Sequence, residues 1–291
     1  MDSIAPKEHS MAGQLAILLA AFFWSTSGLF IKLLDWHPIV ISGLRSLIAA
    51  VFLLIVRLIS PPRKGGKNPP SVFWACAVTF AFTIFTYVTA NKLTTAANVI
   101  LLQYSAPVWA ALLGWYLAKE KPNWEHWLAL VFVMGGLLLF FRGGLDPGAI
   151  TGNVLAVISG ILFGAHTVFL RMLKDGDPRD AMLLAHAATA ALSVPFFFLY
   201  PPALNITNGT IILYMGLVQM GVASLLISYG IKRTSAIQAM LTSIIDPMLN
   251  PVWVMLITGE KPSLSALAGG AIIIAAVLFS SIIGMRRTEK K

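Results

Sequence analysis

The sequence predicts an all-α membrane protein: ten transmembrane helices form two inverted five-helix repeats, with both termini on the cytoplasmic side (N-in/C-in). Three observations predict this fold class. Of the 291 residues, 57% are hydrophobic and only 11% are charged. The chain contains ten apolar runs of about the length that crosses a bilayer. Finally, the segment 232–262 repeats the segment 92–122 without a gap.

The composition excludes an ordinary soluble protein, which carries about 25% charged residues. The net charge is +9, but the charges lie between the apolar runs, so no basic face is available for nucleic acid. We interpret these charges as topology signals beside membrane helices. The lone Cys76 cannot form an intramolecular disulfide. The first apolar run is too long for a cleavable signal and has no small-residue cleavage site.

The ten runs define the predicted organisation of the chain. They cover residues 12–34, 39–59, 72–90, 95–118, 124–141, 150–172, 181–200, 210–230, 235–258 and 264–285. The predicted regions are a cytoplasmic N-terminus (1–11), a first five-helix repeat (12–145), a second, inverted five-helix repeat (146–285) and a basic cytoplasmic C-terminus (286–291).

The orientation follows from the positions of Lys and Arg. With a cytoplasmic N-terminus, 16 of the 21 Lys and Arg residues lie in the N-terminus, the C-terminus or the inside loops. The outside segments hold only Lys32, Lys92, Arg142 and Lys261, and Arg45 lies within the second run. Because positive residues concentrate on the cytoplasmic side, this bias predicts that both termini are inside.

The repeated segment predicts a broken helix in each half. Its eight identical pairs are Lys92/Lys232, Thr94/Thr234, Ala96/Ala236, Leu101/Leu241, Pro107/Pro247, Glu120/Glu260, Lys121/Lys261 and Pro122/Pro262. A proline inside a membrane helix frees backbone groups that lipid cannot satisfy, so neighbouring helices or a wet cavity must satisfy them. We predict helix breaks at Pro107, Pro247 and Pro251.

The first and sixth runs are also related, since residues 13–32 resemble residues 152–171 at a shift of 139. Each half therefore has five helices, and this odd number inserts the second half upside down relative to the first. Inverted repeats with broken helices in corresponding positions indicate a binding site between the halves, which alternating access exposes to either side.

The ninth helix carries a polar face that we predict lines this site. Ser243, Asp246 and Asn250 recur at i, i+3 and i+7, and Gln103 lies on the matching face of the fourth helix. An intramembrane carboxylate is costly unless it faces a cavity or a partner. Asp246 either contacts a substrate amino group or carries a proton, or it caps backbone groups freed by Pro247 or bonds to Asn250.

Aromatic residues predict the other walls of the cavity. Trp24 and Phe163 are equivalent in the repeats, as are Ser27 and His166 three residues later. Tyr87 in the third helix and Tyr104 in the fourth extend this set. Apolar walls with a few placed polar groups are typical of small-molecule pockets. The alternative is that these side chains face lipid or fill the core.

Three further charged residues are predicted to be structural or gating residues. Arg45 either binds a substrate carboxylate or serves the fold, by reaching the outer surface or by pairing with Asp35 or Glu260. Glu120 and Glu260 are predicted to be structural features of helix ends rather than ligands.

These features together resemble the EamA family of the drug/metabolite transporter superfamily, in particular its YddG-type amino acid exporters. The resemblance rests on the five-plus-five helices, the proline-broken fourth and ninth helices and the Glu-Lys-Pro after each. Thr258-Gly259-Glu260 matches the family pattern well, whereas Ala118-Lys119-Glu120 matches it less well. Arg45, within the segment 43–50, resembles the family's second-helix pattern.

The resemblance implies an exporter of amino acids, aromatic or neutral, or of related small metabolites across the bacterial inner membrane by alternating access. A multidrug exporter of the same fold and an intramembrane enzyme pairing a serine with His166 are the alternatives. No nucleotide-binding loop is visible, and no catalytic reaction, cofactor, metal or nucleic acid is expected. The expected partners are the small-molecule substrate and the lipid bilayer, and a monomer is expected to suffice.

Overall fold

The computed structural model describes residues 10–60, 69–140, 150–258 and 264–289. All of the regular secondary structure in these residues is helical. The first half contains α1 (Met11–Trp24), α2 (Ser27–Leu33), α3 (Pro38–Ile59), α4 (Pro70–Leu93), α5 (Ala96–Gln103), α6 (Ala106–Leu117) and α7 (Trp124–Phe140). The second half contains α8 (Ile150–Met172), α9 (Pro178–Leu199), α10 (Ile206–Tyr214), the π-helix η1 (Met215–Val222), α11 (Ala223–Ile231), α12 (Ala236–Thr242), α13 (Ile245–Thr258) and α14 (Leu264–Glu289).

Each predicted apolar run coincides with one of these helices or with consecutive helices. Six helical stretches are long and apolar enough to cross a membrane, and they cover residues 11–33, 38–59, 70–93, 150–172, 178–199 and 206–231. Two shorter apolar stretches among the described residues are Ala106–Leu117, which is α6, and Ala268–Ser280, which lies within α14. The prediction of an all-helical membrane protein is therefore confirmed, whereas ten crossings and the N-in/C-in orientation stay predictions.

Polar caps set where the helices of the repeated segment begin. The Thr95 hydroxyl accepts a hydrogen bond from the Asn98 amide at 3.2 Å. Its repeat equivalent, Ser235, accepts one from the Gln238 amide at 3.3 Å. Both residues satisfy a backbone N–H that has no partner inside its helix. The two copies of the repeat thus begin their broken helices by the same device.

Both broken helices are interrupted a few residues before the repeated proline. The first interruption lies at residues 104–105, so Pro107 falls in the first turn of α6. The second lies at residues 243–244, so Pro247 falls in the first turn of α13. Proline is well tolerated there because the first-turn N–H groups have no intrahelical acceptor. The prediction of a break at Pro251 is wrong: α13 continues from Ile245 to Thr258, and prolines inside membrane helices are tolerated where neighbouring groups satisfy the freed backbone.

A third interruption, between α1 and α2, was not predicted. The Ser25 hydroxyl donates to the Phe22 carbonyl at 2.6 Å, and the Thr26 hydroxyl donates to the Phe23 carbonyl at 2.9 Å. Such bonds from Ser and Thr to the preceding turn compete with the helix ladder and bend helices. The equivalent helix of the second half, α8, is continuous, so the two halves differ here.

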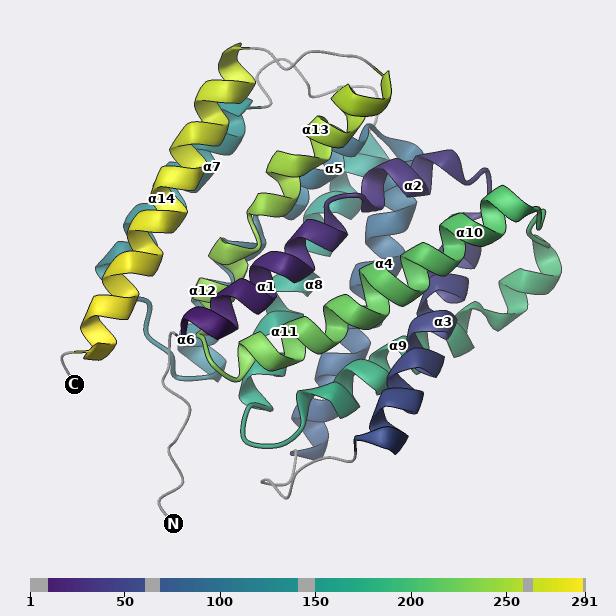
Figure 1. Cartoon of the computed structure of the whole chain (residues 1–291), viewed down its shortest axis with the longest axis horizontal. Coiled ribbons are helices and arrows are strands. Elements are labelled where there is room, and N and C mark those ends of the chain that lie inside the picture. Colours follow the sequence, from purple (N-terminus) through teal and green to yellow (C-terminus); the bar gives the residue numbers. More distant parts are fainter. Residues whose placement is uncertain (1–9, 61–68, 141–149, 259–263, 290–291) are drawn as a thin grey trace.

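The helices pack in pairs that join the two halves (Figure 1). The four pairs with the most extensive contact are α4 with α8, α7 with α14, α3 with α9, and α1 with α11; all but α7 with α14 surround the largest core. This apolar core includes Ile17, Ile41 and Leu170. The helices α7 and α14 run side by side along one flank, at the left of Figure 1. The core therefore lies between elements from different halves.

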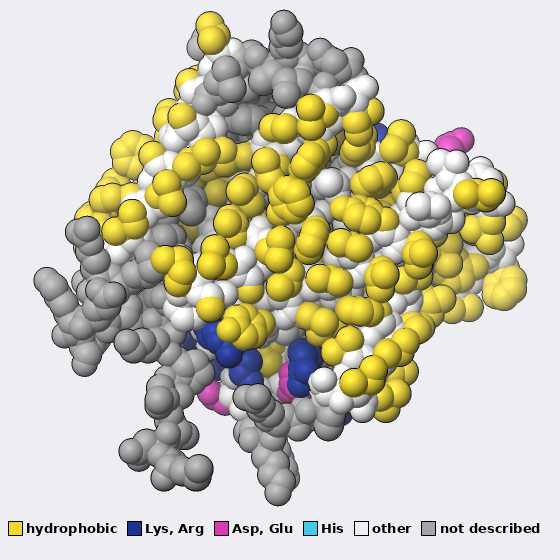
Figure 2. Space-filling view, in the orientation of Figure 1, with side chains coloured by type: hydrophobic (Ala, Val, Ile, Leu, Met, Phe, Trp, Pro, Cys, Tyr) yellow, Lys and Arg dark blue, Asp and Glu magenta, His cyan; other side chains and the backbone are white. Residues whose placement is uncertain are grey.

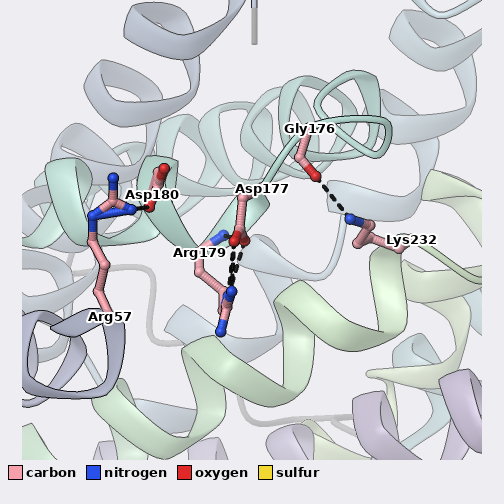
Figure 3. Close-up of polar contacts among 6 residues, drawn as sticks. All are labelled: Arg57, Gly176, Asp177, Arg179, Asp180 and Lys232. Carbon is pink, nitrogen blue, oxygen red and sulfur yellow. Dashed lines mark hydrogen bonds and ion pairs between the residues drawn. The ribbon is translucent and has the colours of Figure 1, made fainter. Parts of the chain in front are cut away.

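Charged side chains gather along one edge of a mostly hydrophobic face (Figure 2). Figure 3 shows charged residues at the ends of α3, α9 and α11. Arg57 pairs with Asp180, and Lys232 donates to the Gly176 carbonyl at 2.7 Å. All of these residues belong to segments predicted to be cytoplasmic. A band of apolar surface next to a charged edge is what a membrane-spanning bundle requires.

We expect Asp177→Ala to lower the free energy of unfolding by about 1 kcal/mol. Asp177 caps α9 by accepting from the Arg179 amide at 3.1 Å, and the Arg179 side chain pairs with it at 2.6 Å. Burial works to raise the pKa of Asp177, but the hydrogen bonds and charge of Arg179 outweigh burial and hold the pKa below its ordinary value. Chemical unfolding in detergent measures the loss.

The pH dependence of this effect has a fixed sign. Because the folded pKa of Asp177 lies below the unfolded value of about 3.9, its contribution is complete above that pH and is lost as the pH falls through the lowered pKa. The difference between wild type and Asp177→Ala should therefore be constant from pH 6 to 8. A difference that shrinks across that range would contradict this assignment.

Candidate functional site

A cavity of about 60 Å³ lies at the middle of the helix bundle. It is bounded by α1, α2, α3, α4 and α5 from the first half and by α8, η1, α11 and α13 from the second. Six of the predicted site residues line it: Trp24, Ser27, Tyr87, Gln103, Phe163 and Asp246. Arg45 lines the cavity as well. The remaining wall is mainly apolar, with Phe80, Ile84 and Met220.

The repeat-equivalent aromatics meet at this cavity. The rings of Trp24 and Phe163 are 5.8 Å apart in an edge-to-face arrangement, which is a favourable geometry for aromatic pairs. Gln103 is fixed by a hydrogen bond to the Ser159 hydroxyl at 2.8 Å, and that hydroxyl donates to the Thr83 carbonyl at 3.2 Å. The fourth, third and sixth predicted spans are thus tied together at the wall.

Arg45 is completely buried and only partly satisfied. Its Nη1 donates to the Ser27 hydroxyl at 3.3 Å, while Nε and Nη2 have no hydrogen-bond partner. The suggestions that it reaches the outer surface or pairs with Asp35 are wrong, because α3 turns this position toward the cavity and Arg45 has 0% exposure. Pairing with Glu260 lies outside the described residues.

Asp246 also keeps an unsatisfied atom at the cavity. Its Oδ2 accepts from the Tyr104 hydroxyl at 3.0 Å, whereas its Oδ1 has no hydrogen-bond partner. Tyr104 also lies 2.8 Å from the Ser243 carbonyl, at the helix interruption. Tyr104 therefore satisfies the freed backbone group, which was one of the structural roles considered for Asp246.

Asn250 does not bond to Asp246. Its amide donates to the Ser25 carbonyl at 2.9 Å, and Trp253 donates to the Ser25 hydroxyl at 2.7 Å. A Cβ at Gly28 would lie 2.9 Å from the Asn250 amide nitrogen, so the two helices approach closely there. Asn250 thus holds the interruption of the first helix against α13. Its position is beside the cavity rather than in its wall.

His166 and Ser243 line a second, smaller cavity of about 10 Å³ behind the aromatic wall. His166 Nδ1 lies 3.0 Å from the Cys76 carbonyl oxygen, and the Ser243 hydroxyl donates to the Ala239 carbonyl at 2.9 Å. Trp24 and Phe163 line both cavities and form the partition between them. His166 makes no hydrogen bond to a serine within the part of the chain that the structure describes.

The family profile of the EamA-like transporters matches the chain twice, over residues 11–142 and 150–282. This chain belongs to the EamA-like transporter family. Because these matches cover most of the sequence, the protein is a multi-pass membrane transporter. Family membership also supports a role other than that of an enzyme.

Several relatives of this EamA protein span nearly its whole length. The uncharacterized transporter YwfM of Bacillus subtilis is 26% identical over 92% of this chain and 93% of its own. An uncharacterized transporter of Archaeoglobus fulgidus is 26% identical over 92% and 96%. The pseudopaline exporter CntI of Pseudomonas aeruginosa is 23% identical over 67% of each chain.

A solved crystal structure has the same fold as this EamA protein. It is 20% identical in sequence, and the superposition has a TM-score of 0.77 over 94% of this chain and 98% of that one. This likeness shows the fold alone.

Glu120 and Arg171 tie the two halves of the EamA chain together at the predicted inner end. Arg171 Nε contacts Glu120 Oε1 at 2.6 Å and its Nη1 donates to the Ile231 carbonyl at 2.9 Å. The second Glu120 oxygen accepts from the Ala236 amide at 3.3 Å, at the start of α12. Glu120 thus links the end of α6 to α8 and α12, as a structural or gating residue would. Its repeat equivalent, Glu260, lies outside the described residues.

The sequence reasoning missed three buried polar residues at the cavity: Thr83 and Ser224 in its wall, and His186 behind Ser224. His186 lies on α9, which was not predicted to approach the cavity, and its Nε2 is 3.0 Å from the Ser224 hydroxyl in the cavity wall. Its ring also contacts Phe80 at 4.7 Å between centroids. No motif or repeat match marks His186, so periodicity alone gave no signal for it.

Proposed function

We propose that this protein exports amino acids, or closely related small zwitterions, by alternating access of the central cavity. One observation carries the proposal: a buried guanidinium and a buried carboxylate line the same small cavity. They form no ion pair with each other in the described part of the chain. Unpaired buried charges are expensive, so a protein that keeps two of opposite sign needs a reason to do so.

A zwitterionic substrate supplies that reason. Its carboxylate would accept from Nε and Nη2 of Arg45, the geometry in which Arg binds carboxylates bidentately. Its ammonium group would donate to Oδ1 of Asp246. The side chain would then lie against Trp24 and Phe163, which offer aromatic faces and no further charge. This arrangement favours neutral side chains, aromatic ones among them.

The size of the cavity limits the cargo. A cavity of about 60 Å³ has room for a few water molecules, so the helices must move apart to admit an amino acid and would have to open much further for a large drug-like molecule. The name of the relative CntI, a pseudopaline exporter, supports export of a small metabolite. The bacterial relatives support a bacterial plasma (inner) membrane, and we propose a monomer with both termini cytoplasmic.

Counterflow uptake into proteoliposomes tests this function. We expect a panel of labelled amino acids to show exchange of a few neutral ones and little exchange of acidic or basic ones. Trp24→Ala removes half of the aromatic partition, so we expect exchange of aromatic amino acids to fall at least about tenfold, which corresponds to 1.4 kcal/mol. Trp74→Ala, an exposed tryptophan on α4, is the matched control and should exchange like wild type.

Two outcomes would contradict the proposal. Exchange of large cationic drugs in place of amino acids would favour a multidrug exporter. Amino acid exchange that is equal in wild type and Trp24→Ala would keep the transporter but remove the aromatic pair from the substrate site.

A further inference from the structure

The end of α6 and the residues that follow it carry an exposed apolar-to-basic gradient. Leu112, Trp115 and Tyr116 recur at i, i+3 and i+4 on one face of α6, and Lys119 follows two residues after the helix ends. Trp115 is 50% exposed and Tyr116 is 73% exposed. With Lys121 these residues line a groove of about 500 Å³. We call these five residues the basic-aromatic groove.

Lys119 adopts a backbone conformation that favours glycine. Its φ is 57°, in the left-handed region. The Glu120 amide returns to the Gly114 carbonyl at 3.1 Å, so the chain folds back over the end of α6 beside the left-handed residue. Glycine is the usual residue there because any side chain destabilises this conformation. A lysine at this position indicates that its side chain has a use.

The second copy of the repeat serves as an internal control. At the equivalent positions it has Val252, Met255, Leu256 and Gly259. The second copy therefore carries neither the two aromatic residues nor the lysine of the first copy. Lys121 alone is shared, as Lys261. The groove is a feature of the first copy and hence of one side of the membrane.

The positive charge of the groove is not neutralised by neighbouring carboxylates. Lys119 Nζ lies over the Tyr116 ring at 5.5 Å from its centroid. The adjacent Glu120 turns inward to Arg171, and Glu125 is buried. Neither Lys119 nor Lys121 forms an ion pair with a carboxylate among the described residues. Two ammonium groups thus stand at the charged end of an apolar and aromatic groove.

We propose that the basic-aromatic groove binds an anionic phospholipid of the inner leaflet. Its phosphate would lie between Lys119 and Lys121, with the glycerol region against Tyr116 and Trp115 and an acyl chain along Leu112. Tyr and Trp favour this interfacial level, and basic pockets on the cytoplasmic side bind anionic head groups. The order from apolar to aromatic to cationic matches the order of groups in the lipid.

Thermal unfolding of the purified full chain in a neutral detergent tests the proposal. Dioleoyl phosphatidylglycerol near 100-fold above its Kd should raise the Tm of wild type by roughly 5 °C, whereas dioleoyl phosphatidylcholine should not. Lys119→Gly should unfold at a higher Tm than wild type without lipid, because it relieves the left-handed lysine, and should lose the phosphatidylglycerol shift. Lys119→Gln should lose the shift without the higher starting Tm.

Arg233→Gln is the matched control, since this cation also stacks on an aromatic residue, Tyr229, but lies outside the groove. It should keep the full phosphatidylglycerol shift. The proposal is overturned if Lys119→Gln keeps the wild-type shift or if Arg233→Gln loses it equally. It is also overturned if phosphatidylcholine or inorganic phosphate produces the same shift, because the groove would then not read an anionic lipid.

Discussion

Arg45→Gln should reduce counterflow exchange of neutral amino acids by at least about 30-fold. Removing one partner of a buried, hydrogen-bonded charge pair costs about 2 kcal/mol or more, and each 1.4 kcal/mol is a factor of ten. In wild type, Nε and Nη2 of Arg45 are free to bind a carboxylate. The measurement is initial exchange of labelled substrate at a concentration below its half-saturation value.

The same variant distinguishes a substrate role from a structural one. Because two of the Arg45 nitrogens have no protein partner, removing the charge relieves an unpaired buried cation, and the Tm without substrate should stay equal or rise. A fall of many degrees would instead assign Arg45 to the fold. Arg57→Gln is the matched control: it removes the same group from the same helix, at a surface ion pair, and should exchange like wild type.

Asp246→Asn should cause a loss of similar size, at least about 30-fold, for amino acids with a free amino group. Asparagine keeps the shape of the side chain and an oxygen for the Tyr104 hydroxyl, which contacts Oδ2 at 3.0 Å. It removes the negative charge that an ammonium group requires. The measurement is again initial exchange in proteoliposomes.

The control for Asp246→Asn is Asp35→Asn, which makes the same change at an exposed position. It should leave exchange unchanged. If Asp246→Asn exchanges amino acids at the wild-type rate, the ammonium site lies elsewhere in the cavity.

The helical framework was predictable because it depends on periodicity and charge alone. A run such as residues 150–172 is mostly apolar over a length that crosses a bilayer, which needs no tertiary information. The interruptions beside Pro107 and Pro247 were predicted from the repeated prolines, which can also be read without tertiary information. The interruption at Ser25 was not, because Ser and Thr are common inside membrane helices and bend them only in some contexts.

The direction in which each side chain points within the bundle was harder to predict from the sequence. The repeat relation pointed to Trp24 and Phe163, and the structure brings their rings into contact. Arg45 was predicted to be a structural or gating residue or to bind a substrate carboxylate, since its depth along α3 does not say which face of the helix it occupies. Asn250 shares a helical face with Asp246 in sequence, yet it bonds to Ser25 across the interface. Such choices depend on how helices from different halves pack, which the sequence of one helix does not contain.

The most direct test of the zwitterion site combines the variants Arg45→Gln and Asp246→Asn with two altered substrates. The exchange of a labelled neutral amino acid is measured in the presence of unlabelled competitor, which is the free amino acid, its carboxamide or its N-acetyl derivative. Wild type should bind both derivatives at least about 30-fold more weakly than the free amino acid. Arg45→Gln should lose discrimination against the carboxamide alone, and Asp246→Asn against the N-acetyl derivative alone. Equal competition by all three compounds in wild type, or the same pattern in both variants, would contradict the assignment of one charge to each end of the substrate.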